Sequence, residues 1–181
     1  MNVFVLCTGR CGSRTFYEAC KHATNFTAGH ESRARCVGVD AMRYPPDHIE
    51  VDNRLAFRVG RLWQEYGCRS STRWVVLGRD PSAVKASYER KWVLSFLRLA
   101  QCGITMQRQC NTNEHVRDAL LTMRANIELL IRSQPAASVM RLRLERMPRD
   151  FEFFWQWIGA EGDRDAALAE WSVLHNAGEG R

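Results

Sequence analysis

Residue types that bind anions are concentrated near the start of the chain, in the segment "CTGRCGSRTF" (7–16). The segment follows the apolar run "VFVL", and its two glycines allow the backbone to approach a ligand closely. Arg10 and Arg14 carry positive charge, and the hydroxyl groups of Ser13 and Thr15 can donate hydrogen bonds. This pattern predicts a loop that holds a phosphate-like group at the start of a helix. A glycine-rich turn that binds nothing is the alternative.

A second anion-binding pattern lies in "LGRDPSAVKASYERKW" (77–92). Arg79 follows an apolar run, and Ser87 comes eight positions later, after Pro81 and a short helical segment. A guanidinium fork and a hydroxyl group make charge-assisted hydrogen bonds to a phosphate. An isolated arginine at such a position is more often a surface ion-pair partner, so the inference depends on the first segment lying nearby.

Hydrophobic periodicity predicts strands that alternate with helices. Strands are expected at 2–8, 25–29, 73–78 and 138–145, and helices at 14–22, at 53–67, from Pro81 onward, around 116–131 and around 151–158. This alternation is typical of an α/β fold with a central parallel sheet and helices on both faces. Both anion-binding segments then lie beyond the carboxyl ends of strands, where such sheets bind ligands. The segment 101–114 lacks clear periodicity and is expected to form a loop.

Composition narrows the class of protein. The 181 residues, 45% of them hydrophobic, predict a single domain over residues 1–181. The 26 basic residues exceed the 20 acidic ones and favour an anionic ligand, but they are spread along the chain, which argues against a nucleic-acid partner. No apolar run is long enough for a transmembrane segment, and the opening residues "MNVFVL" lack the basic flank, the long apolar core and the cleavage site expected of a signal peptide. Seven cysteines without CxxC pairs predict reduced thiols and a cytoplasmic location.

Neither glycine of the first segment is followed by lysine, so the loop departs from the Walker A pattern GxxxxGK[ST]. Together the two segments instead resemble the sulfotransferases that use 3′-phosphoadenosine 5′-phosphosulfate (PAPS), which have a P-loop type nucleotide-binding fold. The resemblance implies that Arg10 contacts the 5′-phosphosulfate and that Arg79 and Ser87 bind the 3′-phosphate, with adenosine 3′,5′-bisphosphate (PAP) as product. The cofactor-binding set that it implies is Gly9, Arg10, Cys11, Gly12, Ser13, Arg14, Thr15, Arg79 and Ser87.

Two features depart from that family's pattern. Arg14 stands where many members have a second threonine. The later glycine-rich loop that touches the nucleotide in many members has no clear counterpart, and the candidates by position are "GAEGD" (159–163) and "HNAGEGR" (175–181).

The same resemblance points to a general base in "GHES" (29–32), directly after the second expected strand. Glu31 is the first choice to take the proton of an acceptor hydroxyl group, with His30 as the base itself or as an orienting neighbour. The expected catalytic residues are Glu31, His30 and Arg10, acting without a metal on a small-molecule or glycan acceptor. Residues 52–54, "DNR", either line the acceptor site or serve as capping and surface residues.

Two other enzyme-related hypotheses stay open. A P-loop nucleotide or small-molecule kinase would share the sheet and the phosphate loop, with Asp80 as the nearest candidate for a magnesium ligand. A catalytically inactive nucleotide-binding relative would keep the loop and lack the chemistry.

Overall fold

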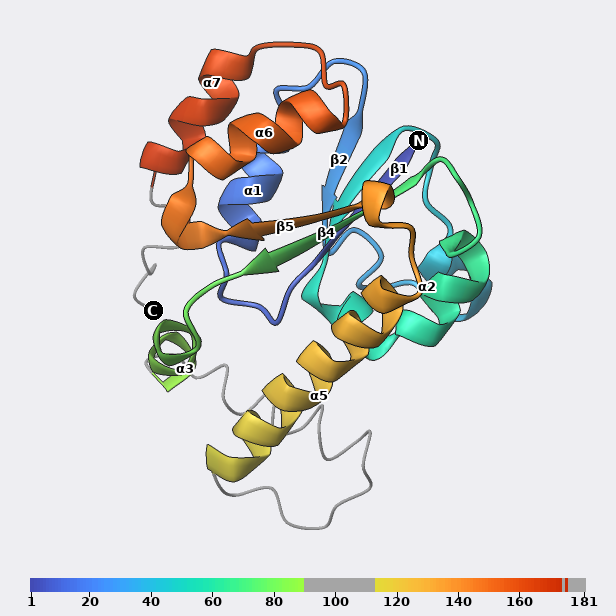
Figure 1. The fold of residues 1–181 in the computed structure, drawn as a ribbon, viewed down its shortest axis with the longest axis vertical. Coiled ribbons are helices and arrows are strands. Elements are labelled where there is room, and N and C mark those ends of the chain that lie inside the picture. The colour runs from blue at the N-terminus through green and yellow to red at the C-terminus, as the bar shows by residue number, and fades with distance from the viewer. Residues whose placement is uncertain (90–112, 174, 176–181) are drawn as a thin grey trace.

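A computed structural model of the chain describes residues 1–89, 113–173 and 175. Its centre is a five-stranded sheet in which every pair of neighbouring strands is parallel, in the order β2-β3-β1-β4-β5 (Figure 1). The strands are β1 (Asn2–Leu6), β2 (Thr27–His30), β3 (His48–Val51), β4 (Thr72–Gly78) and β5 (Val139–Arg143). The α/β fold with a parallel sheet is therefore confirmed.

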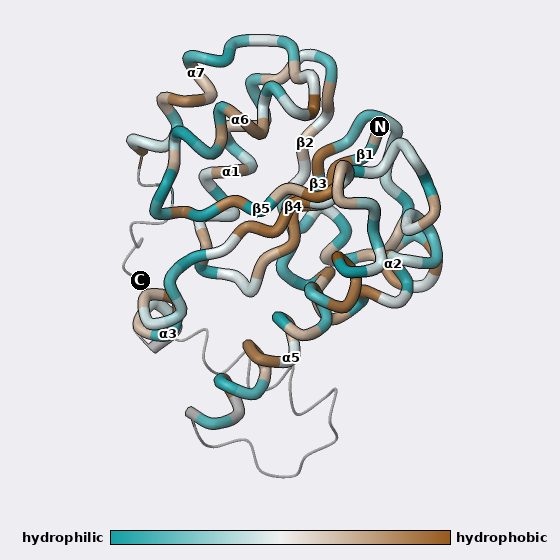
Figure 2. The backbone as a smooth tube through the Cα atoms, viewed as in Figure 1, coloured by the Kyte–Doolittle hydropathy of each residue, from teal (hydrophilic) through white to brown (hydrophobic). Residues whose placement is uncertain are grey.

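Helices cover both faces of this sheet, because successive side chains of a strand point to opposite faces. Val3 and Val5 of β1 belong to a core with α1, α6 and α7, whereas Phe4 and Leu6 belong to a second core with α2 and α5. The central strands accordingly form the most hydrophobic part of the backbone trace (Figure 2). The helices are α1 (Ser13–Cys20), α2 (Val59–Tyr66), α3 (Pro81–Glu89), α5 (Asn113–Arg132), α6 (Arg149–Trp157) and α7 (Arg164–Ala169).

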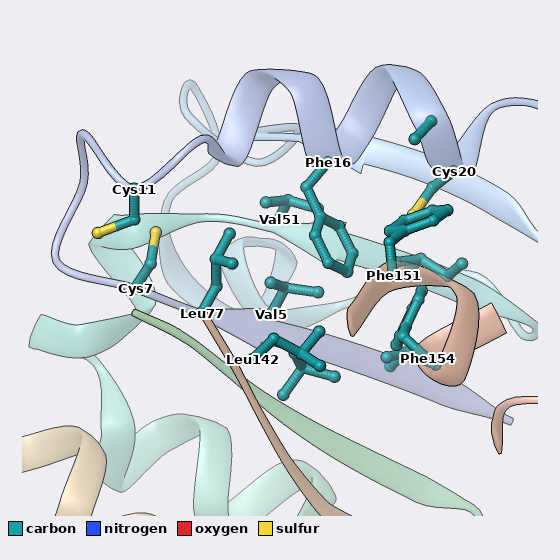
Figure 3. Packing of buried hydrophobic residues seen from close by; sticks show 14 of the residues in the cluster. Val5, Cys7, Cys11, Phe16, Cys20, Val51, Leu77, Leu142, Phe151 and Phe154 are labelled. Carbon is teal, nitrogen blue, oxygen red and sulfur yellow. The ribbon is translucent and has the colours of Figure 1, made fainter. Parts of the chain in front are cut away.

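Aromatic packing fixes α1 on its face of the sheet. The ring of Phe16 lies 5.1 Å from that of Phe151 and 4.9 Å from that of Phe154, both on α6 (Figure 3). Burial of an aromatic side chain contributes roughly 1.5–3 kcal/mol. Since α1 begins directly after the loop that follows β1, this packing also fixes the position of that loop.

Strand β3 was not expected from the sequence, and it inserts between β1 and β2. All four of its residues are buried, but two of them, His48 and Glu50, are polar, so the segment shows no apolar run. The single helix expected at 53–67 is also wrong: a 3₁₀ turn (Asn53–Phe57) precedes α2, and the Asp52 side chain accepts from the Arg54 N–H at its start. Of the loop expected at 101–114, residues 101–112 lie outside the described residues, and the last two begin α5.

The order of the strands creates a crevice beside β1. Strand β1 pairs with β3 on one side and with β4 on the other, so the connections that leave these neighbouring strands run in opposite directions. Ligands of open parallel sheets bind outside the carboxyl ends of the strands at such a switch point. Here that position is occupied by the loop 7–12, with Asp52 and Arg79 at the ends of the neighbouring strands.

Candidate functional site

The loop after β1 has an unusual backbone. Gly9, Arg10 and Gly12 all have positive φ, at 79°, 56° and 83°. A Cβ atom on Gly9 would lie 2.3 Å from the Tyr88 hydroxyl oxygen and 2.8 Å from Nδ2 of Asn53, so only glycine fits there. Arg10 is a non-glycine residue in this region, a strained state that usually persists at functional sites.

The backbone amides of this loop lack partners. From Arg10 to Thr15, no backbone N–H donates a hydrogen bond to any residue that the structure describes. The N-cap residue of α1 is Gly12, which has no side chain to accept hydrogen bonds from the amides of the first turn. Successive free N–H groups at the start of a helix form a concave site with positive potential, suited to a phosphate or sulfate group.

The structure brings the two sequence motifs into contact. Nε of Arg10 donates to Oγ of Ser87 at 3.0 Å, and Nη1 of Arg79 donates to the carbonyl oxygen of Arg10 at 3.1 Å. Within the described ranges, no carboxylate lies within ion-pair distance of either guanidinium group. Two cations thus meet beside the free amides without a negative charge to balance them, which favours an anionic ligand.

The other residues of the loop have different roles. Arg14 turns away along α1, where its guanidinium pairs with Glu18 at 2.6 Å and lies over the ring of Tyr17 at 5.2 Å. Its charge is therefore already matched within the helix. Thr15 is half-buried in the first turn of α1 and is one of the residues with a free N–H.

Cys7 and Cys11 are buried beneath the loop (Figure 3). Sγ of Cys11 donates to the carbonyl oxygen of Gly9 at 3.1 Å, which ties the loop to itself. Burial raises the pKa of both thiols, so they are protonated and poor nucleophiles at neutral pH. The Cys11 side chain therefore has a structural role, because its hydrogen bond to Gly9 holds the loop in place.

The two candidate bases stand at the end of β2. Nε2 of His30 lies in hydrogen-bond contact with Oγ of Ser13, at 3.3 Å, so the histidine reaches the first turn of α1. Burial lowers the pKa of His30 below its ordinary value, and the nearby charge of Glu31 offsets only part of this effect, so the imidazole is neutral at pH 7. Glu31 has a positive φ of 52°, and its N–H donates to the Val51 carbonyl oxygen at 3.2 Å. Its carboxylate has no hydrogen-bond or ion-pair partner in the described part of the chain.

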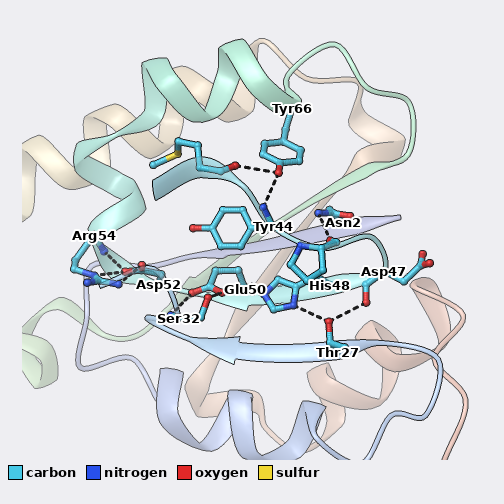
Figure 4. A network of polar contacts seen from close by, with 12 residues as sticks. Asn2, Thr27, Ser32, Tyr44, Asp47, His48, Glu50, Asp52, Arg54 and Tyr66 are labelled. Atoms are coloured by element: carbon cyan, nitrogen blue, oxygen red, sulfur yellow. Dashed lines mark hydrogen bonds and ion pairs between the residues drawn. The ribbon is translucent and has the colours of Figure 1, made fainter. Parts of the chain in front are cut away.

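A buried polar network holds this turn, and no local pattern in the sequence predicts it (Figure 4). Both oxygens of Glu50 are used: one accepts from the Ser32 N–H at 2.8 Å, and the other contacts the Ser32 hydroxyl at 2.5 Å and Nε2 of His48 at 2.9 Å. The opposite ring nitrogen of His48 contacts the Thr27 hydroxyl at 2.8 Å. Glu50 is fully buried, and it connects β3 to the residue after Glu31.

Of residues 52–54, Asn53 is the one whose side chain lies next to the phosphate loop. Arg54 and Asp52 form a fork, with Nε to Oδ1 at 2.9 Å and Nη2 to Oδ2 at 2.6 Å (Figure 4). Asn53 lies beside Gly9, and its Oδ1 is buried without a donor among the described residues. A buried unsatisfied oxygen is rare, and here it can accept a hydrogen bond from a ligand.

Two other sequence candidates lie elsewhere. The "GAEGD" segment (159–163) packs behind the C-terminal end of α1, where Thr24 N–H donates to the Glu161 carbonyl oxygen at 2.7 Å, so it is at the opposite end of α1 from the loop. The "HNAGEGR" segment lies outside the described residues except for its first residue. Oδ1 of Asp80 accepts from the N–H groups of Ser82 and Ala83 and so caps α3.

Among the residues that the structure describes, no helix is both long and apolar enough to span a membrane. No protein-family model matches the chain, and a search of curated proteins finds no significant match.

Proposed function

We propose that this protein transfers a sulfuryl group from PAPS to the hydroxyl group of an acceptor. The observation that carries the proposal is the contact between the two motifs: Arg10 donates to Ser87, and Arg79 donates to the Arg10 carbonyl, at 3.0 and 3.1 Å. A donor with phosphate groups at two separate points of one adenosine needs two adjacent anion sites. The free amides of residues 10–15 supply one, and Arg79 with Ser87 supplies the other.

The residues of the loop fit the sulfate end of such a donor. PAPS supplies a sulfuryl group whose bond to the bridging phosphate oxygen breaks as the acceptor oxygen bonds to sulfur. Negative charge then grows on the departing 5′-phosphate, beside the loop amides and the Arg10 guanidinium. Preorganised donors of this kind contribute roughly 2–4 kcal/mol each to transition-state stabilisation.

Glu31 is the base in this proposal. Its carboxylate is free of partners, stands at the end of β2 and takes the proton of the acceptor hydroxyl group. His30 is held against Ser13 and orients the turn, while the free Oδ1 of Asn53 accepts from the acceptor. The acceptor therefore lies on the β2–β3 side of the loop, and the nucleotide on the β4 side.

Two measurements test this function. Calorimetric titration with PAP, AMP, ATP and a short oligonucleotide should give the tightest binding with PAP, since only PAP fills both anion sites. Transfer from labelled PAPS to a panel of glycans, phenols and lipids should then proceed in the presence of EDTA. Equal affinity for PAP and AMP would contradict the two-site assignment, and binding of PAP without transfer to any acceptor would favour the inactive relative.

The kinase alternative has a weaker basis. Its nearest magnesium ligand, Asp80, uses Oδ1 to cap α3. ATP binding tighter than PAP binding, with turnover that disappears in EDTA and returns with magnesium, would favour the kinase over the sulfotransferase.

A further inference from the structure

A cavity of about 290 Å³ opens between β4 and α5, next to the candidate site. It shares Cys7, Thr8 and Arg79 with that site, but most of its walls take no part in the function proposed above. Cofactor pockets usually measure roughly 300–1,000 Å³, so the cavity has room for part of a nucleotide. Its lining consists of Cys7, Thr8, Val76, Leu77, Gly78, Arg79, Pro81, Arg124, Ile127, Glu128 and Arg143.

The charge on these walls is positive. Three arginines line the cavity, and Glu128 is its only carboxylate. Both oxygens of Glu128 accept from the guanidinium group of Arg141 at 2.7 Å, and this pairing lowers the pKa of Glu128. The acid is therefore already neutralised by a residue outside the lining.

Arg124 is left without a partner as a result. It lies one helical turn before Glu128 on α5, a spacing at which two such residues often pair. Glu128 is instead held by Arg141, and no other carboxylate among the described residues lies within ion-pair distance of Arg124. Burial raises the pKa of the Cys11 thiol, while the charges of both Arg79 and Arg124 lower it. The two cations therefore act electrostatically on the same thiol beneath the loop.

The remaining walls are apolar. Val76 on β4, Ile127 on α5 and Pro81 at the start of α3 give the cavity a surface that suits a ring rather than a free inorganic ion. An anion carried on a ring, such as a phosphate on a ribose with its base, matches both the apolar walls and the two free guanidinium groups.

The order of the strands indicates whether the donor or the acceptor occupies the cavity. The candidate bases stand at the end of β2, whereas the cavity lies at the end of β4, with β3 and β1 between them. Three inter-strand spacings of about 4.8 Å separate the two positions by roughly 14 Å. The acceptor hydroxyl group that reacts at Glu31 is therefore distant from the cavity, whereas a donor whose phosphosulfate sits in the loop after β1 has its nucleotide one strand away from it.

We propose that the cavity binds the 3′-phosphate end of the donor nucleotide and that Arg124 is a binding residue for this phosphate, together with Arg79. The inference rests on the proposed function, since it extends the same nucleotide site to α5. Arg141 has an indirect part in it, because it keeps Glu128 from pairing with Arg124.

The test compares two charge-removing variants of α5. Arg124→Met removes the guanidinium at the cavity, and Arg132→Met removes an exposed one at the far end of the same helix. Calorimetry gives the ratio of the Kd values for AMP and PAP in each protein, and thermal unfolding checks that both variants fold. Loss of one charge-assisted contact should reduce this ratio about tenfold in Arg124→Met and leave it unchanged in Arg132→Met.

The outcomes separate the two proposals. If the unsubstituted protein shows no preference for PAP, the two-site assignment and this extension of it both fail. If it prefers PAP and Arg124→Met keeps the whole preference, only the role of Arg124 is overturned. Equal weakening of AMP and PAP would place Arg124 at the 5′ end, and an increased KM for the acceptor with unchanged nucleotide binding would assign the cavity to the acceptor; either result contradicts the proposal.

Discussion

The two sides of the sheet's carboxyl edge differ in how many of their polar groups have partners within the protein. On the β2–β3 side, the buried acids Glu50 and Asp52 have partners on both of their oxygens. On the β1–β4 side, Arg10 and Arg79 have no acidic partner in the described part of the chain, and the neighbouring amides are free. Buried polar groups that satisfy one another usually specify structure, whereas a cluster of cations and free donors has a use only with an anion.

The same contrast separates two glutamates that are close in the fold. Glu50 is fully buried and accepts from Ser32 and His48, while Glu31, directly before Ser32, has a carboxylate without a partner. One therefore supports the turn and the other is available for chemistry. Substituting each of them in the same way tests this division directly.

Glu31→Gln should have the largest effect on activity. The amide keeps the shape of the side chain and cannot take a proton, so kcat should fall by roughly 10²- to 10⁴-fold, the range for a lost general base. The Kd for PAP and the Tm should stay unchanged, since the carboxylate has no hydrogen-bond or ion-pair partner among the described residues. The measurement is transfer from labelled PAPS to the acceptor found by screening. Near-normal turnover in Glu31→Gln, with turnover abolished in His30→Asn, would reverse the roles of the two residues.

Glu50→Gln should instead lower stability. The new amide group has one acceptor oxygen in place of two, so a donor from Ser32 or His48 loses its partner inside the protein. An unsatisfied buried group costs about 1–3 kcal/mol, and we expect a loss of about 2 kcal/mol in the free energy of unfolding, measured in urea. A variant as stable as the parent would show that the network does not hold this turn.

Arg79→Met tests the cationic side of the comparison. The variant loses the donor to the Arg10 carbonyl and the charge beside the loop, so the preference for PAP over AMP should fall about tenfold. Arg73→Met, at the other end of β4, is the matched control and should keep the preference. A full preference in Arg79→Met would mean that the 3′-phosphate lies elsewhere.

Most of the fold could be predicted because its signals are local. The apolar run of β1, the glycines after it and the long periodic stretch of α5 each specify one element without reference to the rest. Strand β3 could not be predicted in this way. His48 and Glu50 are buried there only because Thr27 and Ser32, which are distant in sequence, satisfy them.

The candidate site shows the same limit. Topology alone indicated that Arg10 and Arg79 would lie at one edge of the sheet, because each follows the carboxyl end of a parallel strand. The sequence did contain a signal that Arg14 would leave the loop, since Glu18 stands one helical turn later. Nothing in the local sequence distinguishes Arg124 from the exposed arginines of α5, because its role depends on how that helix packs against β4.

The smallest predicted effect concerns His30, which lies between the two regions. Burial lowers its pKa below the ordinary value of 6.5, so the unfolded chain takes up a proton before the folded protein does as the pH falls. His30 therefore costs no stability well above pH 6.5, and its penalty grows as the pH falls through 6.5 toward the folded-state pKa. Because the imidazole is only partly buried, we expect a change of less than about 1 kcal/mol.

Urea unfolding of the parent protein and of His30→Asn at several pH values between about 7.5 and 5.5 isolates this contribution, because the other histidines titrate in both proteins. The difference in unfolding free energy should shift in favour of His30→Asn as the pH falls, since asparagine carries no proton to lose or gain. A difference that stays constant would show that His30 has the same pKa in both states. A shift in favour of the parent would mean that the folded protein stabilises the imidazolium through Glu31, which would place His30 with the partnered groups of the β2–β3 side.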